Sequence, residues 1–242
     1  MRQAGRIVGR TLAHLREGIR PGVLTVELDR VADELIRGAG AVPSFKGYRG
    51  YPASLCVSIN EELVHGIPGP RRLREGDIVS LDLGAIYHDY HADAAITVGV
   101  GVIGAEARHL LKATAGALAA GIQRARAGNR LGDISAAIQS YVEARGLSVV
   151  REYVGHGIGR EMHEPPPVPN FGSPGQGPLL RPGMTLALEP MVNAGSPATR
   201  VLEDHWTVVT VDGSLSAHFE HTLAIGEVEP EILTDLTLPK RV

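Results

Sequence analysis

The sequence predicts an α+β fold built from two similar halves. Three observations support this prediction: helical patterns twice precede clusters of strand-like segments, the spacing of these segments repeats after about 107 residues, and glycine and proline are frequent without a periodic pattern. The 30 glycines and 16 prolines indicate many tight turns rather than a fibrous chain. A chain of 242 residues with 43% hydrophobic residues can also bury a sizeable core.

Apolar residues at helical spacing predict two helices in each half. In the second helix the apolar positions run from Leu28 to Ile36 at i, i+3, i+4, i+7 and i+8, with Thr25 as the expected N-cap. The same spacing recurs from Ile134 to Val142, beginning 106 residues later. The four helices are expected near residues 3–17, 25–38, 105–126 and 132–145.

Strand-like runs follow the helices in each half. Gly76 and Gly183 each precede such a run and are 107 residues apart. An acidic residue lies six positions after each glycine, Asp82 in the first half and Glu189 in the second, so the repeat aligns two carboxylates. Because helices precede strand clusters in both halves, we expect an antiparallel or mixed sheet rather than parallel βαβ winding. The strands are expected near residues 54–59, 77–83, 93–98, 149–154, 184–189, 206–211 and 218–225.

Charge and cysteine content exclude several classes of function. The formal net charge of -3 provides no basic surface for nucleic acid or an anionic membrane. The single cysteine, Cys56, excludes an intramolecular disulfide and a cysteine-based zinc cluster, and it fits a reducing compartment, so the cytoplasm is the expected location. The longest weakly polar run, residues 96–105, is shorter than the roughly 18 residues that a membrane helix needs.

Four acidic residues lie in or beside apolar strand-like runs: Asp82, Asp93, Glu189 and Glu220. A buried carboxylate is costly unless a cation or hydrogen bonds compensate it. These runs contain no Lys or Arg, whereas two divalent ions would balance four carboxylates. His156, which has a glycine on each side, adds an imidazole to the set. Carboxylate and imidazole ligands suit Mn²⁺, Fe²⁺, Co²⁺ or Zn²⁺ and favour activation of a water molecule for hydrolysis.

Together, several short strings resemble the methionine aminopeptidases. Besides Asp82 and Asp93, eleven positions apart, they comprise residues 64–68, 155–160, 162–164, 188–193 and 216–222. The resemblance spans nearly the whole chain. It indicates the bacterial type I form, because Glu220 follows Glu189 by only 31 positions and the helical insertion of type II enzymes would not fit between them.

The resemblance implies the pita-bread fold, with residues 1–242 as one catalytic domain whose halves are about 1–100 and 101–242. It also implies two divalent ions, of Co, Mn, Fe, Zn or Ni, bound by Asp82, Asp93, His156, Glu189 and Glu220. In this family a hydroxide that bridges the ions attacks the first peptide bond of a chain that begins with methionine and has a small second residue. Glu189 would assist the proton transfer.

Further residues receive roles from the same resemblance. His65 and His163 match two histidines that contact the substrate and the developing oxyanion. A monovalent cation would bind at Asn60 and Ser216. The substrate pocket would comprise Phe45, Tyr48, Tyr51, Cys56, His65, Met162, His163 and Trp206. The remaining histidines match no ligand position and are expected to be surface or packing residues: His14, His88, His91, His109, His205, His218 and His221.

The implied partner is the N-terminal methionine of nascent polypeptides at the ribosome. We expect the protein to be a monomer and to bind neither nucleic acid nor a membrane. Two alternatives share the fold. A proline-directed peptidase, of the aminopeptidase P or prolidase type, has the same five ligands but usually an extra N-terminal domain, and the string Glu189–Asn193 favours the methionine type. A non-catalytic binding module would have lost ligands, whereas all five positions are filled here.

Overall fold

The four expected helices are present in the structure. A computed structural model describes residues 1–236 of the chain. The helices are α1 (Arg2–Gly18), α2 (Thr25–Gly38), α3 (Ala105–Arg124) and α4 (Leu131–Glu143), together with a short 3₁₀ turn, η1 (Tyr48–Gly50). Each helix begins and ends within two residues of its expected bounds, so these predictions are confirmed.

The start of α2 differs from the prediction that Thr25 is its N-cap. The N-cap is Leu24, whose backbone N–H donates to the Glu27 side chain at 3.1 Å. The Thr25 hydroxyl instead accepts a hydrogen bond from the Gly69 N–H at 2.8 Å and donates one to the Gly69 carbonyl at 3.0 Å. Thr25 therefore joins the first turn of the helix to a distant loop rather than capping it.

The sheets of the two halves have the same core order. The strands of the first half are β1 (Val42–Pro43), β2 (Cys56–Ile59), β3 (Glu62–Val64), β4 (Ile78–Tyr87) and β5 (Tyr90–Gly99). Those of the second half are β6 (Ser148–Val149), β7 (Gly155–Gly157), β8 (Glu164–Val168), β9 (Thr185–Leu188), β10 (Met191–Asn193), β11 (Thr199–Val201), β12 (Val208–Thr210), β13 (Ser216–His218), β14 (His221–Ala224) and β15 (Glu231–Ile232). The order β2-β4-β5 matches β7-β9-β14, and every pairing among the described strands is antiparallel. This match confirms the two related halves.

Two expected strands are shorter or divided. The strand expected at 149–154 is only the two-residue β6, and β7 follows it at residues 155–157, where no strand was expected. The strand expected at 218–225 is divided into β13 and β14, with Phe219 and Glu220 between them. This break allows β13 to pair with β10 while β14 pairs with β9.

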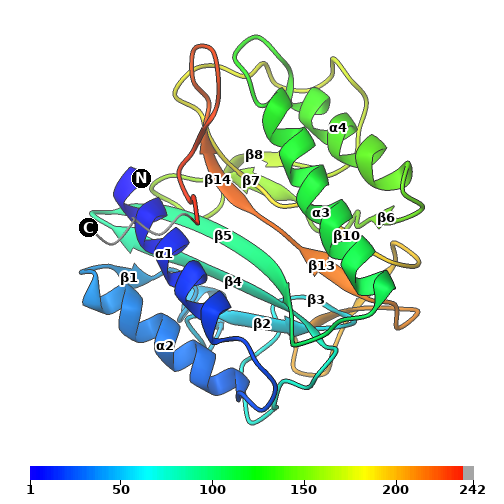
Figure 1. Ribbon diagram of the computed structural model, residues 1–242. Helices are drawn as coiled ribbons and strands as arrows, with labels where there is room; N and C mark the ends of the chain where they lie inside the picture. Colours follow the sequence, from blue (N-terminus) through cyan, green and yellow to red (C-terminus); the bar gives the residue numbers. More distant parts are fainter. Residues whose placement is uncertain (237–242) are drawn as a thin grey trace.

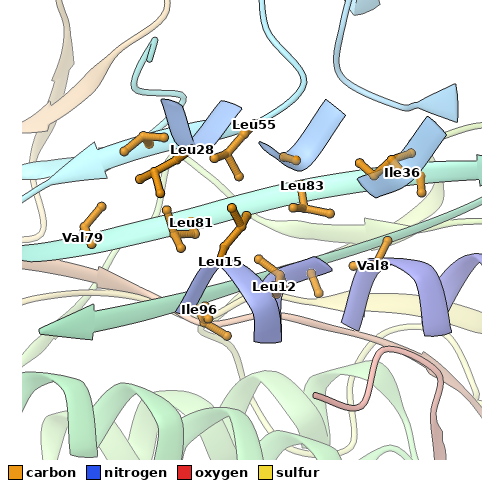
Figure 2. Packing of buried hydrophobic residues seen from close by; sticks show 14 of the residues in the cluster. Val8, Leu12, Leu15, Leu28, Ile36, Leu55, Val79, Leu81, Leu83 and Ile96 are labelled. Carbon is orange, nitrogen blue, oxygen red and sulfur yellow. The ribbon is translucent and has the colours of Figure 1, made fainter. Parts of the chain in front are cut away.

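The helices cover the outer faces of the sheets (Figure 1). α1 and α2 pack over the strands of the first half, and α3 and α4 pack over those of the second half. Figure 2 shows the first of these cores, where Leu12 and Leu15 of α1 and Leu28 of α2 lie in one buried cluster with Leu81 of β4. Phe219 packs against the cores of both halves and so links them.

Residues 1–236 include no helix that is long and apolar enough to cross a membrane. The last residues of the expected domain, 237–242, lie outside the described residues.

Candidate active site

Five residues proposed from the sequence as metal ligands line one cavity of about 150 Å³. They come from both halves: Asp82 from β4, Asp93 from β5, His156 from β7, Glu189 from the end of β9, and Glu220 from the break between β13 and β14. Ligand atoms of Asp93, His156 and Glu220 lie within 4.8 Å of one another. The fold therefore brings together side chains that are up to 138 positions apart in the chain.

The β4–β5 hairpin explains why Asp82 and Asp93 meet. Asp82 is opposite Ala95, and Asp93 is opposite Gly84. The two acids are thus diagonal neighbours on the same face of an antiparallel pair, where side chains come within reach of each other. The eleven-residue separation seen in the sequence follows from this register.

Glu220 reaches the hairpin through backbone contacts between the halves. Its N–H donates to the Ala95 carbonyl at 2.9 Å. Beside it, the Thr222 hydroxyl donates to the Asp93 carbonyl at 2.7 Å and accepts from the Asp93 N–H at 2.9 Å. β5 and β14 are therefore joined where the two acids face each other.

His156 is held by its neighbouring glycines. A Cβ at Gly155 would lie 2.4 Å from the Ala187 carbonyl oxygen, and one at Gly157 would lie 2.3 Å from the Pro165 carbonyl oxygen, so only glycine fits at either position. His156 Nδ1 contacts the Gly157 carbonyl at 2.9 Å, which leaves Nε2 as the acceptor atom. Nε2 lies 3.5 Å from Glu189 Oε1.

The electrostatics of the cavity demand a positive charge. Burial is the largest cause that raises the pKa of Asp82, Asp93, Glu189 and Glu220, and repulsion by neighbouring carboxylates raises it further at Asp82, Glu189 and Glu220. Among the described residues none of these acids forms an ion pair with Lys or Arg. One oxygen each of Asp82, Asp93 and Glu220 is buried without a hydrogen-bond partner. Orphaned oxygens beside an imidazole nitrogen are a donor set that fits divalent metal ions.

His65 and His163, the two histidines that the sequence predicted to contact the substrate, line the same cavity. The His163 ring lies 4.2 Å from the His156 ring, centroid to centroid, and its Nδ1 contacts the Tyr48 hydroxyl at 2.9 Å. Burial is the main cause that lowers the pKa of His163, to about 4, and it also lowers the pKa of His65. Both imidazoles are therefore neutral near pH 7 and can donate or accept one hydrogen bond at each free nitrogen.

Apolar and aromatic side chains form the other wall of the cavity: Phe45, Tyr48, Tyr51, Cys56, Met162 and Trp206. The Tyr51 and Trp206 rings meet edge to face, with 5.1 Å between centroids. The pairing of Val64 with Val208 brings β3 and β12 together and so places Trp206 near His65. Burial raises the pKa of the Cys56 thiol, which agrees with a pocket-lining residue rather than a nucleophile. The predicted pocket residues are thus brought together with the acids.

Asn60 and Ser216 also lie next to each other, but not in this cavity. The Ser216 N–H donates to the Asn60 carbonyl at 2.9 Å. The Asn60 amide donates to Asp77 Oδ1 at 2.9 Å, and the Ser216 hydroxyl donates to Asn193 Oδ1 at 2.8 Å. The structure therefore brings the two residues together through their backbones.

Sequence reasoning missed two residues at the site. Arg49 lines the cavity, and its guanidinium lies 5.3 Å from the centre of the Tyr48 ring. His218, expected as a surface or packing residue, is 1% exposed and lies 3.8 Å from Glu189 through its Nε2. The position of Arg49 between two expected pocket tyrosines, and that of His218 two residues before Glu220, were signals that could have identified them.

Comparison with known proteins agrees with this geometry. The profile of metallopeptidase family M24 matches residues 1–227. The chain belongs to metallopeptidase family M24. It is 57% identical to a methionine aminopeptidase of Clostridium perfringens over 97% of this chain and 94% of that protein, and 56% identical to methionine aminopeptidase 1 of Bacillus subtilis with the same coverage.

Several solved structures share the fold. The crystal structure of a methionine aminopeptidase from Thermotoga maritima superposes with a TM-score of 0.96 at 47% identity and covers 97% of this chain and 95% of that one. A prolidase from Pyrococcus horikoshii has a TM-score of 0.79 at 22% identity, covers 98% of this chain and 61% of that one, and shows the likeness of fold alone. The pita-bread fold is thereby confirmed.

Proposed function

We propose that this M24 metallopeptidase removes the N-terminal methionine from polypeptides whose second residue is small. The observation that carries the proposal is one cavity lined by four carboxylates and His156 together with a cluster of apolar and aromatic side chains. The first set suits hydrolysis of a peptide bond with the help of metal ions, and the second suits an unbranched apolar side chain.

The relatives favour methionine over a proline-directed specificity. Proteins at 56–57% identity over nearly the whole chain are named methionine aminopeptidases. The prolidases and the X-Pro aminopeptidase among the structural neighbours are 21–24% identical, a level that supports a common fold only.

Two divalent ions, of Co, Mn, Fe, Zn or Ni, would be held by Asp82, Asp93, His156, Glu189 and Glu220. This assignment is supported by the orphaned carboxylate oxygens and by the absence of Lys or Arg partners among the described residues. When bound, such ions lower the pKa of a water molecule and polarise the scissile carbonyl. The four negative charges of the carboxylates balance the four positive charges of two divalent ions. This balance favours a site with two metal ions over a site with one.

Three side chains would then act on the peptide. Glu189 would accept a proton from the attacking water, because its carboxylate faces the cavity between the other acids and His156. His163 and His65 would donate hydrogen bonds to the substrate and to the oxygen on which negative charge develops. The Tyr48 hydroxyl at His163 Nδ1 supports this role, because it leaves Nε2 of that ring for the substrate.

The apolar wall would bind the methionine side chain. Thioether sulfur packs favourably against ring edges, and Tyr51 and Trp206 provide such edges. Phe45 and Met162, both buried, would close the wall and limit the length and branching of the side chain.

We further infer a setting for the enzyme. The substrates would be nascent polypeptides met at the ribosome in the cytoplasm, a location that the single buried cysteine supports. The exposed apolar side chains of the described residues are scattered over many elements, which supports a monomer. Asn60 and Ser216 would hold a monovalent cation through backbone atoms.

A peptide assay tests the proposed function. The metal-loaded protein should release methionine from Met-Ala-Ser and leave Leu-Ala-Ser and Ala-Pro-Ser intact. Chelation should abolish the release, and Mn²⁺, Fe²⁺ or Co²⁺ should restore it. Cleavage of Ala-Pro-Ser instead would reject the methionine specificity in favour of the proline-directed type.

A further inference from the structure

One buried histidine next to the candidate site has no hydrogen-bond partner for its ring in the described structure. His218 ends β13 and is 1% exposed, and neither of its ring nitrogens forms a hydrogen bond in the described structure. A buried imidazole without a hydrogen bond is destabilising, so its position requires a reason. The acidic oxygen within reach of the ring is Oε2 of Glu189, 3.8 Å from His218 Nε2.

The backbone holds His218 firmly in this place. Its N–H donates to the Thr97 hydroxyl at 2.9 Å, and its carbonyl accepts from the same hydroxyl at 2.8 Å. His218 is also opposite Met191 in the pairing of β13 with β10, so the strand that follows Glu189 and the strand that carries His218 are joined. The ring and the carboxylate are therefore fixed relative to each other by two elements.

The two oxygens of Glu189 face two different histidines. Oε1 lies 3.5 Å from His156 Nε2, and Oε2 lies 3.8 Å from His218 Nε2. His156 lines the cavity, whereas His218 is not among the lining residues. His218 is thus placed to contact Glu189 but not the substrate.

We propose that His218 is a positioning residue for Glu189. The Nε2–H of His218 donates a hydrogen bond to Oε2 of the ionised Glu189 carboxylate and so fixes the orientation of that carboxylate in the cavity. A shift of about 1 Å in the Glu189 side chain brings the two atoms to hydrogen-bond distance. The role deepens the proposed function and rests on it for its effect on turnover. Its effect on metal binding does not depend on the peptide that is cleaved.

The test compares substitutions that differ in one hydrogen-bond donor. His218→Leu removes the donor and keeps an apolar side chain of similar volume, whereas His218→Gln keeps an N–H at similar reach. If the leucine variant does not fold, His218→Met provides the same comparison with an unbranched side chain. His221→Leu is the matched control, because its ring Nδ1 pairs with Thr234 and it lines no part of the cavity.

Two quantities are measured, the turnover of Met-Ala-Ser and the dissociation constant of Mn²⁺ from calorimetry on the metal-free protein. His218→Leu should lower kcat by roughly 10–100-fold with KM changed by less than about twofold, and should weaken Mn²⁺ binding by about tenfold. His218→Gln should restore both values to within about threefold of the wild type, and His221→Leu should not change them.

Wild-type Mn²⁺ affinity in His218→Leu would overturn the proposal. Equal loss in the leucine and glutamine variants would also overturn it, since the imidazole would then act in a way that an amide donor cannot replace, for example as a ligand. If the wild type released no methionine, the proposed specificity would fail, while the Mn²⁺ comparison would still decide the role of His218.

Discussion

At Glu189, burial and proton transfer make opposite demands on one carboxyl group. Burial, together with the charge of Asp93, raises the pKa of Glu189 well above its usual range. To accept a proton, the Glu189 carboxyl group must be ionised. In a buried cavity with other carboxylates, only nearby positive charge can favour the ionised form. The protonation of this residue therefore depends on whether cations occupy the cavity.

Glu189→Gln should lower the release of methionine from Met-Ala-Ser by about 10²–10⁴-fold, because the amide cannot accept the proton. The fold should persist, since the substitution is nearly isosteric and removes a repelled charge, and thermal unfolding should show this. The matched control is Glu203→Gln, an exposed acid away from the cavity. Wild-type turnover in Glu189→Gln would refute the proton-transfer role.

His163→Ala should lower kcat by about 10²–10³-fold, the usual cost of removing one donor to a developing oxyanion. The metal content, measured by elemental analysis, should not change, because the proposal gives His163 no ligand role. His205→Ala is the control for loss of an exposed histidine. A variant that lost its metal would identify His163 as a ligand instead.

The contact between β5 and β14 determines the geometry of the site at the scale of elements. These two strands come from different halves, yet Glu220 and Thr222 bond directly to the backbone of β5 at Ala95 and Asp93. The hydroxyl of Thr222 satisfies both backbone groups of Asp93, and Thr222 is itself fully buried. The alignment of carboxylates across the cavity thus depends on one side chain that bears no charge.

Thr222→Val should lower the free energy of unfolding by about 1–3 kcal/mol, because it leaves the buried N–H and carbonyl of Asp93 without partners. Urea denaturation of the metal-free protein measures this change. Mn²⁺ affinity should fall in parallel, since Asp93 loses its support. Thr222→Ser keeps the hydroxyl and should retain most of the stability; equal stability of the valine variant and the wild type would contradict the expectation.

At the scale of the whole molecule, the stability of the metal-free protein depends on the four carboxyl groups that lie close together in the cavity. Burial raises the pKa of Asp82, Asp93, Glu189 and Glu220 in the folded state, that of Asp93 to about 7. The folded state then binds more protons than the unfolded chain, so the free energy of unfolding falls as pH rises towards the folded pKa values. Histidines act oppositely, because desolvation lowers the pKa of His163, at the mouth of the cavity, and of the buried His218, but their contribution is complete above about pH 6.5.

Above pH 6.5 the four carboxyl groups oppose only the N-terminal amine of Met1, whose pKa burial lowers from 8.0. Four carboxyl groups outweigh one partly buried amine, so the melting temperature of the chelated protein should fall as pH rises to 8. Mn²⁺ should oppose this fall, so the stabilisation by Mn²⁺ should increase with pH, reaching about 3 kcal/mol at a concentration 100 times its dissociation constant. Differential scanning fluorimetry with and without chelator measures both trends. Asp93→Asn should make the fall shallower, and a chelated wild type whose melting temperature is constant or rises over this range would refute the prediction.

Local patterns predicted much of this protein and failed at identifiable places. Helical spacing identified all four helices because their apolar positions face one core, as at Leu28 and Ile36. It placed the cap of α2 wrongly because the Thr25 hydroxyl bonds to Gly69, a residue that only the folded chain brings near. His218 received no role because Glu189, the carboxylate that its ring approaches to 3.8 Å, is distant in sequence.

The sequence by itself determined which residues carry charge into apolar strands, the repeat that aligns Asp82 with Glu189, and the strings that resemble one enzyme family. Only the tertiary structure decided that these carboxylates share a cavity with aromatic side chains, that Thr222 joins the halves at Asp93, and that the His218 ring lies 3.8 Å from Glu189. The physical reason is that periodicity reports which face of an element is buried, whereas contacts between elements depend on strand register and on packing between segments far apart in the chain.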